Sequence, residues 1–111
     1  MESLRLEFES PPSPKRNHKA FAIAGVVGSG NLEVLIEPAE AGGKCLITVN
    51  TPIRGYEETW RAVLSDFVAR HPLAGVQVTI NDGGATPAIV GLRLDQAALD
   101  YFAISDSEPG R

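Results

Sequence analysis

The sequence is poor in the residues that most often build reactive or metal-binding sites. It contains one cysteine, Cys45, two histidines and one tryptophan in 111 residues. A single cysteine excludes an internal disulfide and a cysteine metal cluster, and two isolated histidines among scattered acids give no metal-ligand spacing. We therefore expect no metal site and no catalytic cluster.

Basic residues and long apolar runs are also scarce. Ten Lys plus Arg against fourteen Asp plus Glu leave a net charge of -4, which disfavours nucleic acid as a partner, because phosphate binding needs a concentrated basic face. No apolar run approaches the ~20 residues of a membrane span, and the first five residues do not resemble a signal peptide. We expect a cytoplasmic chain with neither nucleic acid nor membrane as a partner.

The length and composition predict a single domain over residues 1–111. Hydrophobic residues make up 43% and charged residues 22%, as in ordinary globular domains. Residues 10–19 contain three prolines and no large apolar side chain, which predicts a flexible loop. The polar residues 104–111 are expected to fray.

Apolar and polar residues alternate in segments that predict five strands. These are residues 4–8, 21–27, 32–37, 44–51 and 76–80. The tetrad 28–31, Gly-Ser-Gly-Asn, predicts a β-hairpin turn, because Gly and Asn accept positive φ at little cost. Residues 41–43 predict the next turn. Adjacent strands joined by short turns imply an antiparallel or mixed sheet, whose strand order the sequence does not determine.

Two further segments have helical spacing. Apolar residues recur from Trp60 to Val68, and Pro72 should end that helix at His71. Thr86 and Pro87 predict an N-cap followed by proline at the first helical position, and a second stripe continues through Val90, Leu94, Ala97, Ala98 and Tyr101. The predicted class is α+β, with two layers: an antiparallel or mixed sheet of about five strands and two helices packed on one face. A further stripe on the second helix is expected to be additional core rather than a partner surface: Ile89, Leu92 and Leu99.

Few side chains are candidates for catalysis. His18 lies in the proline-rich loop, and His71 is predicted to be a helix C-terminal cation favoured by the dipole. Cys45 lies among apolar strand residues as a small buried hydrophobe. Asp82 precedes two glycines and is predicted to be a turn residue. An independent small enzyme that uses Asp82 and His71 is disfavoured, because nothing in the sequence places them together.

The Gly-rich stretch around Ser29 is the remaining candidate site. It lacks the Gly-Lys-Ser/Thr of a Walker loop, and Glu33 stands where a dinucleotide fingerprint needs its third glycine. Ser29 lies between Gly28 and Gly30 at the predicted hairpin tip. It is either an ordinary turn serine or an exposed attachment point for a large covalent group, and the spacing alone favours the former.

Two blocks of sequence bear on that choice. Residues 25–38, GVVGSGNLEVLIEP, and residues 82–96, DGGATPAIVGLRLDQ, resemble the two signatures of the acyl-carrier (delta) subunit of bacterial malonate decarboxylase. The likeness covers roughly residues 20–102 in colinear order. The acyl-carrier (gamma) chain of citrate lyase is more distantly similar. Ordinary acyl carriers resemble helical bundles with Asp-Ser-Leu at a helix start, a tripeptide that is absent here.

The resemblance implies a non-catalytic acyl carrier. Ser29, flanked by Gly28 and Gly30, would carry 2'-(5''-phosphoribosyl)-3'-dephospho-CoA through a phosphodiester. The carried acetyl and malonyl thioesters would serve the conversion of malonate to acetate and carbon dioxide. The implied partners are acyl-transferase and decarboxylase subunits and a prosthetic-group transferase.

One position departs from the family pattern, and two other interpretations stay open. Asn31 stands where the family usually has Asp, at a position that the transferase would contact. The first alternative is an unmodified structural or interaction subunit of the same kind of complex. The second is a citrate-lyase-type carrier.

Overall fold

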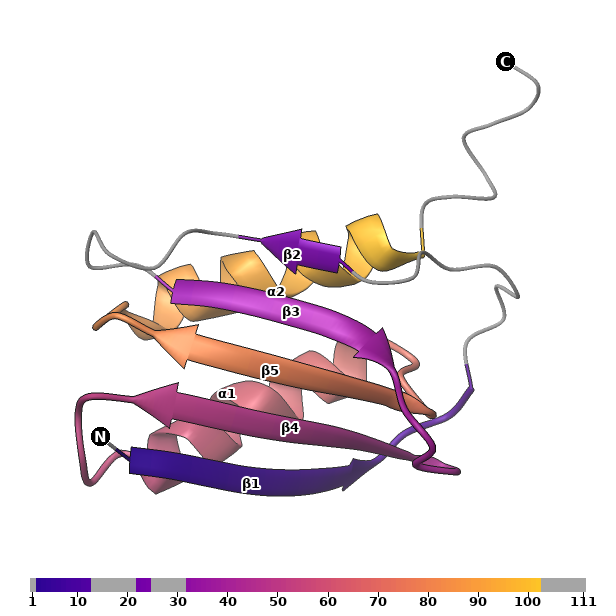
Figure 1. Ribbon diagram of the computed structural model, residues 1–111, viewed down its shortest axis with the longest axis horizontal. Helices are drawn as coiled ribbons and strands as arrows, with labels where there is room; N and C mark the ends of the chain where they lie inside the picture. The colour runs from indigo at the N-terminus through magenta and orange to yellow at the C-terminus, as the bar shows by residue number, and fades with distance from the viewer. Residues whose placement is uncertain (1, 13–21, 25–31, 103–111) are drawn as a thin grey trace, which may run out of the picture.

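The computed structural model describes residues 2–12, 22–24 and 32–102 (Figure 1). Its elements follow the predicted order of four strands, a helix, a strand and a helix: β1 (Glu2–Glu9), β2 (Ala22–Ala24), β3 (Leu32–Pro38), β4 (Lys44–Thr51), α1 (Glu57–Arg70), β5 (Val76–Asp82) and α2 (Pro87–Tyr101). Most of the predicted proline-rich loop and the predicted frayed tail lie outside the described residues. At the start of that loop, Ser10 is buried and its hydroxyl accepts a hydrogen bond from the Leu73 amide over 2.7 Å.

The strands form one mixed sheet in the order β1-β4-β5-β3-β2. β4 and β5 are parallel, and every other neighbouring pair is antiparallel. The short turn between β3 and β4 does not make them neighbours, because β5 lies between them, and β1 and β2 form the opposite edges of the sheet. The crossover through α1 returns the chain parallel to β4, as such connections do. The turn after β3 then passes the start of β5, where the Ala39 amide donates to the Gly75 carbonyl over 2.9 Å.

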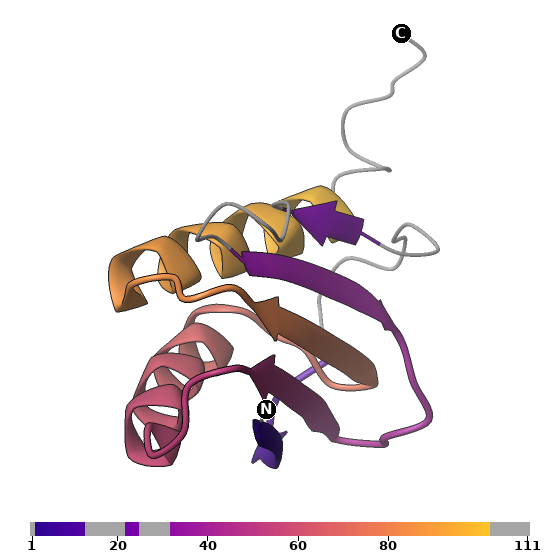
Figure 2. The same ribbon diagram turned by 60° about the vertical axis from the view of Figure 1, so that its left-hand side comes forward.

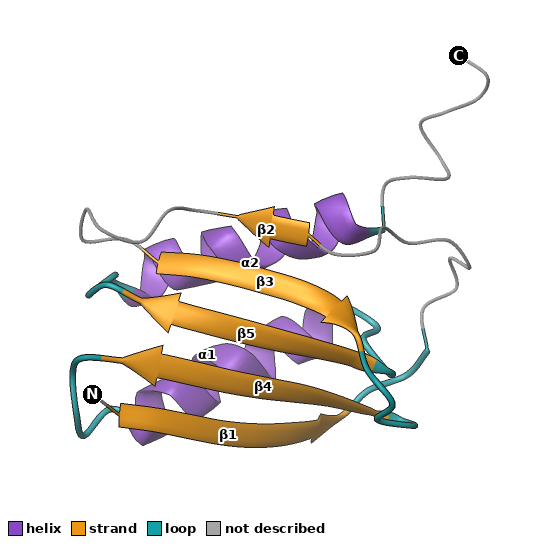
Figure 3. Cartoon of the chain, in the orientation of Figure 1, coloured by secondary structure: helices purple, strands orange, loops and turns teal. Residues whose placement is uncertain are grey.

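Both helices cover one face of the sheet, as predicted, and Figures 2 and 3 show them together on that side. Alternate strand residues point toward the helices and are buried, in agreement with the period-2 pattern. The inward stripe of each helix completes the core: Trp60, Leu64, Phe67 and Val68 from α1, and Val90, Leu94, Ala97, Ala98 and Tyr101 from α2. The α+β two-layer class is therefore confirmed.

The predicted helix signals agree closely with the observed ends. The Thr86 hydroxyl caps α2 by accepting a hydrogen bond from the Ile89 amide over 3.4 Å, and Pro87 is the first helical residue. α1 ends at Arg70, one residue earlier than predicted. His71 is extended, with φ -133° and ψ 134°, because a residue before proline avoids the helical region.

The second apolar stripe of α2 is mostly not core, which corrects the expectation. Leu92 is 52% exposed and Leu99 is 67% exposed, whereas Ile89 is partly buried against the core. Helical residues are spaced by about 100°, so Leu92 lies on nearly the opposite side of the helix from the buried Leu94. The sheet and α1 cover only one side of α2.

Candidate functional site

The predicted attachment segment joins β2 to β3. Its residues 25–31, with Ser29, Gly28 and Gly30, lie outside the described residues. The two strands that flank it are antiparallel neighbours, with Ala24 opposite Val34, so the predicted pairing of two strands across this segment is confirmed. Leu32, the first residue of β3, lies opposite Asp82 at the end of β5. We call this edge of the molecule the Leu32 end.

Asp82 organises the chain at the Leu32 end. Its Oδ2 accepts a hydrogen bond from the Thr51 hydroxyl over 2.9 Å, and its Oδ1 accepts from the amides of Gly84 and Ala85 over 3.0 and 2.9 Å. The carboxylate is buried, with 8% of Asp82 exposed. Asp82 is the last residue of β5, and the hydrogen bonds that its side chain accepts from the Gly84 and Ala85 amides fix the turn that leads into α2. Both oxygens already have neutral donors, so the carboxylate is held in place rather than directed at a substrate.

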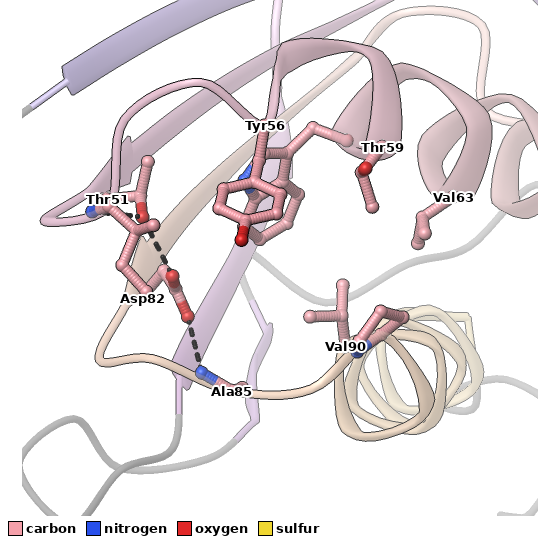
Figure 4. Close-up of a pocket in the computed structure, with 10 residues that line it drawn as sticks. Thr51, Tyr56, Thr59, Val63, Asp82, Ala85 and Val90 are labelled. Atoms are coloured by element: carbon pink, nitrogen blue, oxygen red, sulfur yellow. Dashed lines mark hydrogen bonds between the residues drawn. The ribbon is translucent and has the colours of Figure 1, made fainter.

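A pocket of about 250 Å³ opens beside Asp82, between the first turns of α1 and α2 and the ends of β4 and β5. Figure 4 shows Thr59 and Val63 of α1 facing Val90 of α2 across it, with Asp82 and Thr51 at one side. Among the described residues, its lining includes no Lys, Arg or His, and most of the side chains are apolar or hydroxyl-bearing: Thr51, Ile53, Tyr56, Thr59, Trp60, Val63, Asp82, Ala85, Pro87 and Val90. The pocket suits an uncharged group.

A row of polar side chains crosses the other face of the sheet near the same end. The Ser3 hydroxyl donates to Asn50 Oδ1 over 2.7 Å, and Asn50 Nδ2 donates to Asn81 Oδ1 over 3.0 Å. Asn81 Nδ2 in turn donates to Glu33 Oε1 over 3.2 Å. The row joins β1, β4, β5 and β3, and sequence analysis missed it. In the sequence, the row is visible only as one polar residue at an outward position of each strand. Such residues can be recognised as neighbours only when the strand order is known.

His71 lies at the opposite end of β5 from Asp82 and pairs with another acid. Its Nε2 lies 2.8 Å from Asp95 Oδ1, and Arg70 Nη2 lies 3.0 Å from the same oxygen. Partial burial acts to raise the pKa of Asp95, but hydrogen bonds and charge from His71 and Arg70 outweigh it and lower that pKa below 3.8. The histidine at the end of α1 is therefore part of a structural contact between α1 and α2. His71 and Asp82 are not brought together.

Cys45 is fully buried, as predicted. Burial raises the pKa of its thiol to about 12, so it carries no thiolate at neutral pH. His18 lies outside the described residues. Within the described ranges no three His, Cys, Asp or Glu side chains gather as metal ligands. No described helix combines the length and apolarity needed to cross a bilayer.

Comparison with known proteins gives one consistent family. The model of the malonate decarboxylase delta subunit matches residues 19–101. A malonate decarboxylase acyl carrier protein from Burkholderia cepacia is 58% identical over 95 residues, covering 86% of this chain and 87% of that protein. One from Xanthomonas campestris pv. campestris (strain B100) is 52% identical over 107 residues, covering 96% of this chain and all of that protein.

A solved structure agrees with these relatives. A chain in the crystal structure of a Pseudomonas malonate decarboxylase hetero-tetramer in complex with malonate is 36% identical, with a TM-score of 0.74. The match covers 87% of this chain and 95% of that one. The family match spans the four strands β2 to β5 and both helices, including the Gly-rich segment, Leu32 and Asp82. The chain therefore belongs to the malonate decarboxylase delta-subunit family.

Proposed function

We propose that this chain is the acyl carrier subunit of a malonate decarboxylase, with phosphoribosyl-dephospho-CoA attached to Ser29 through a phosphodiester. The observation that carries the proposal is full-length similarity to proteins named malonate decarboxylase acyl carrier protein, at 52% identity over 107 residues. When bound, the group supplies a thiol on a long arm, on which acetyl and malonyl are carried as thioesters. A cytoplasmic location is part of the same proposal.

The described residues fit an arm of that kind. Ser29 precedes Leu32 by three residues, and Leu32 is fully buried and pairs with Asp82 of β5. The arm would thus be anchored to a rigid strand. Asp82, the strand partner of Leu32, lies in the wall of the apolar pocket, where it is the one carboxylate among the described lining residues and is held by neutral donors. The one carboxylate there already accepts hydrogen bonds from neutral donors, so the described lining residues suit an uncharged thioester.

The chain's own side chains support a carrier role without catalysis. Cys45, with a pKa raised to about 12 by burial, cannot compete with an arm thiol for acyl groups. His71 is committed to Asp95, and Asp82 to Thr51. What the chain contributes is tethering, which keeps an acyl group at high effective concentration near separate active sites. Those sites would belong to acyl-transferase and decarboxylase subunits, and the attachment to a prosthetic-group transferase.

Intact mass spectrometry tests the attachment. We expect the chain, produced together with its prosthetic-group synthesis and transfer enzymes, to gain the mass of the phosphoribosyl-dephospho-CoA group. Ser29→Ala should gain nothing. Ser65→Ala, which removes an exposed serine of α1, is the matched control and should be modified like the wild type. An unmodified wild type, or a modified Ser29→Ala, would contradict the proposal.

Reconstitution of the complex separates the alternatives. With Ser29→Ala in place of the wild-type chain, we expect no release of carbon dioxide from malonate. Retained decarboxylation would favour an unmodified structural subunit. If the modified wild-type chain supports citrate cleavage and not malonate decarboxylation, a citrate-lyase-type carrier would be favoured.

A further inference from the structure

We propose that the pocket beside Asp82 binds the end of the carrier's own arm when that end is uncharged, as a free thiol or an acetyl thioester, and excludes it when it is malonyl. This inference rests on the proposed function. The arm would then have two states. It is folded back onto the chain when it carries a free thiol or an acetyl group, and it is released when it carries malonyl.

The pocket lies close to the residue at which the arm would be attached. Asp82, in the pocket wall, is the direct strand partner of Leu32. Leu32 follows Ser29 by three residues, and three residues of chain span at most about 11 Å. Any group attached at Ser29 is therefore covalently tethered close to the pocket. A tethered ligand needs little intrinsic affinity, because its effective concentration is high.

The size of the pocket selects one part of the arm. Its volume of about 250 Å³ falls below the roughly 300–1,000 Å³ of sites that enclose whole drug-sized ligands. The nucleotide portion is too large and too highly charged for this apolar space. The slender thiol end fits, with its amides within reach of hydroxyl groups in the lining, such as those of Tyr56 and Thr59.

The charge of the lining explains the selection against malonyl. A malonyl carboxylate in the pocket would lose its hydration and find no cationic side chain among the described lining residues, which is costly for any buried ion. It would also lie near the Asp82 carboxylate, with which it shares the sign of charge. An acetyl group adds only a methyl, whose burial is favourable.

The beginning of α2 does not reverse this preference. A helix N-terminus can bind an anion through free amides. Here Pro87 has no N–H, the Ile89 amide is capped by Thr86, and the Gly84 and Ala85 amides donate to Asp82. These positions leave the Ala88 amide of the first turn, and one amide does not offset the burial of a carboxylate among apolar side chains.

Trp60 supplies a direct readout. It is the single tryptophan of the chain, lines the pocket and is 7% exposed. We expect its fluorescence emission to differ between the unmodified chain and the chain with an acetylated arm. The malonyl form should give the emission of the unmodified chain. Intact mass measured on each sample establishes that the arm and its acyl group are present.

Alkylation of the arm thiol by iodoacetamide gives a second readout. Because Cys45 is the single cysteine and is buried, the arm thiol is the one that reacts in the folded chain. We expect it to react about tenfold more slowly than the thiol of free CoA, a ratio equivalent to about 1.4 kcal/mol. Thr59→Phe fills the pocket from an exposed position of α1 and should restore the fast rate. Ala62→Phe, at an exposed position outside the pocket, should keep the slow rate.

The outcomes distinguish this inference from the proposed function. An attached arm whose thiol reacts equally fast in the wild type and Thr59→Phe, with unchanged Trp60 emission, would overturn the inference and leave the carrier role intact. If no arm attaches, the carrier role fails, and S-acetylpantetheine and S-malonylpantetheine are titrated into the unmodified chain. A response of Trp60 to the acetyl compound alone would support the selectivity of the pocket, and an equal response or none would overturn it.

Discussion

The Thr51 hydroxyl donates a hydrogen bond to Asp82 Oδ2 over 2.9 Å, across the only parallel strand pair that the described part of the sheet contains. Both residues are buried and both end their strands. Thr51 Oγ1 also accepts from the Ile53 amide over 3.1 Å. One short network thus ties the ends of β4 and β5 to the two loops that lead into α1 and α2.

Replacing Asp82 should loosen this network. Asp82→Ala leaves the Thr51 hydroxyl and the amides of Gly84 and Ala85 without their acceptor, at an expected cost of about 2–3 kcal/mol in the free energy of unfolding. Thr51→Val preserves shape and removes one donor, so it should cost about 1 kcal/mol. Urea unfolding followed by circular dichroism measures both. An Asp82→Ala variant as stable as the wild type would contradict this role.

Cys45 should be inert in the folded chain. Because burial raises the pKa of its thiol to about 12, we expect no alkylation of the unmodified native protein by iodoacetamide at neutral pH and complete alkylation in urea. Intact mass detects the added group. Rapid alkylation of the native, unmodified chain would show that the strand bearing Cys45 opens easily.

The contact of His71 and Arg70 with Asp95 should make stability depend on acid pH. The pKa of Asp95 is lower in the folded chain than its ordinary value of 3.8. Its stabilisation is therefore fully present above that value and is lost as the pH falls through the folded pKa. Near neutral pH, we expect Asp95→Asn to cost about 0.5–1 kcal/mol, as for other partly exposed ion pairs.

Unfolding of both chains by urea across the acid range checks this dependence. The difference in unfolding free energy between the wild type and Asp95→Asn should shrink as Asp95 becomes protonated. Asp66→Asn, which removes one carboxylate from the exposed side of α1, is the control for the loss of a negative charge. A constant difference between wild type and Asp95→Asn at every pH would exclude the ionic contribution.

Two of the leucines of α2, Leu94 and Leu99, should differ sharply in how much they stabilise the fold. Leu94 is fully buried, and Leu94→Ala should cost about 2–5 kcal/mol through lost burial and the cavity left behind. Leu99 is 67% exposed, and Leu99→Ala should change stability by no more than about 0.5 kcal/mol. Thermal or urea unfolding compares them. Equal effects would mean that α2 is rotated relative to the sheet in solution.

Local signals in the sequence were sufficient for the secondary structure. The alternation in β3 and β4 and the Thr86-Pro87 pair at the start of α2 depend on residues close together in the chain, and periodicity detects such patterns directly. The prediction that Leu92 and Leu99 are core is wrong because that pattern, too, is local. Periodicity shows that residues share a side of a helix, but it does not show whether anything covers that side.

The sequence by itself determined the family, the α+β class and the order of the elements, because signature motifs and apolar periods are properties of neighbouring residues. Only the tertiary structure decided that β5 separates β3 from β4, that Thr51 meets Asp82, and that the first turns of α1 and α2 border a pocket beside Asp82. Each of these contacts joins residues far apart in the chain. They are settled by which strand pairing buries the most apolar surface, a choice made by the whole core at once.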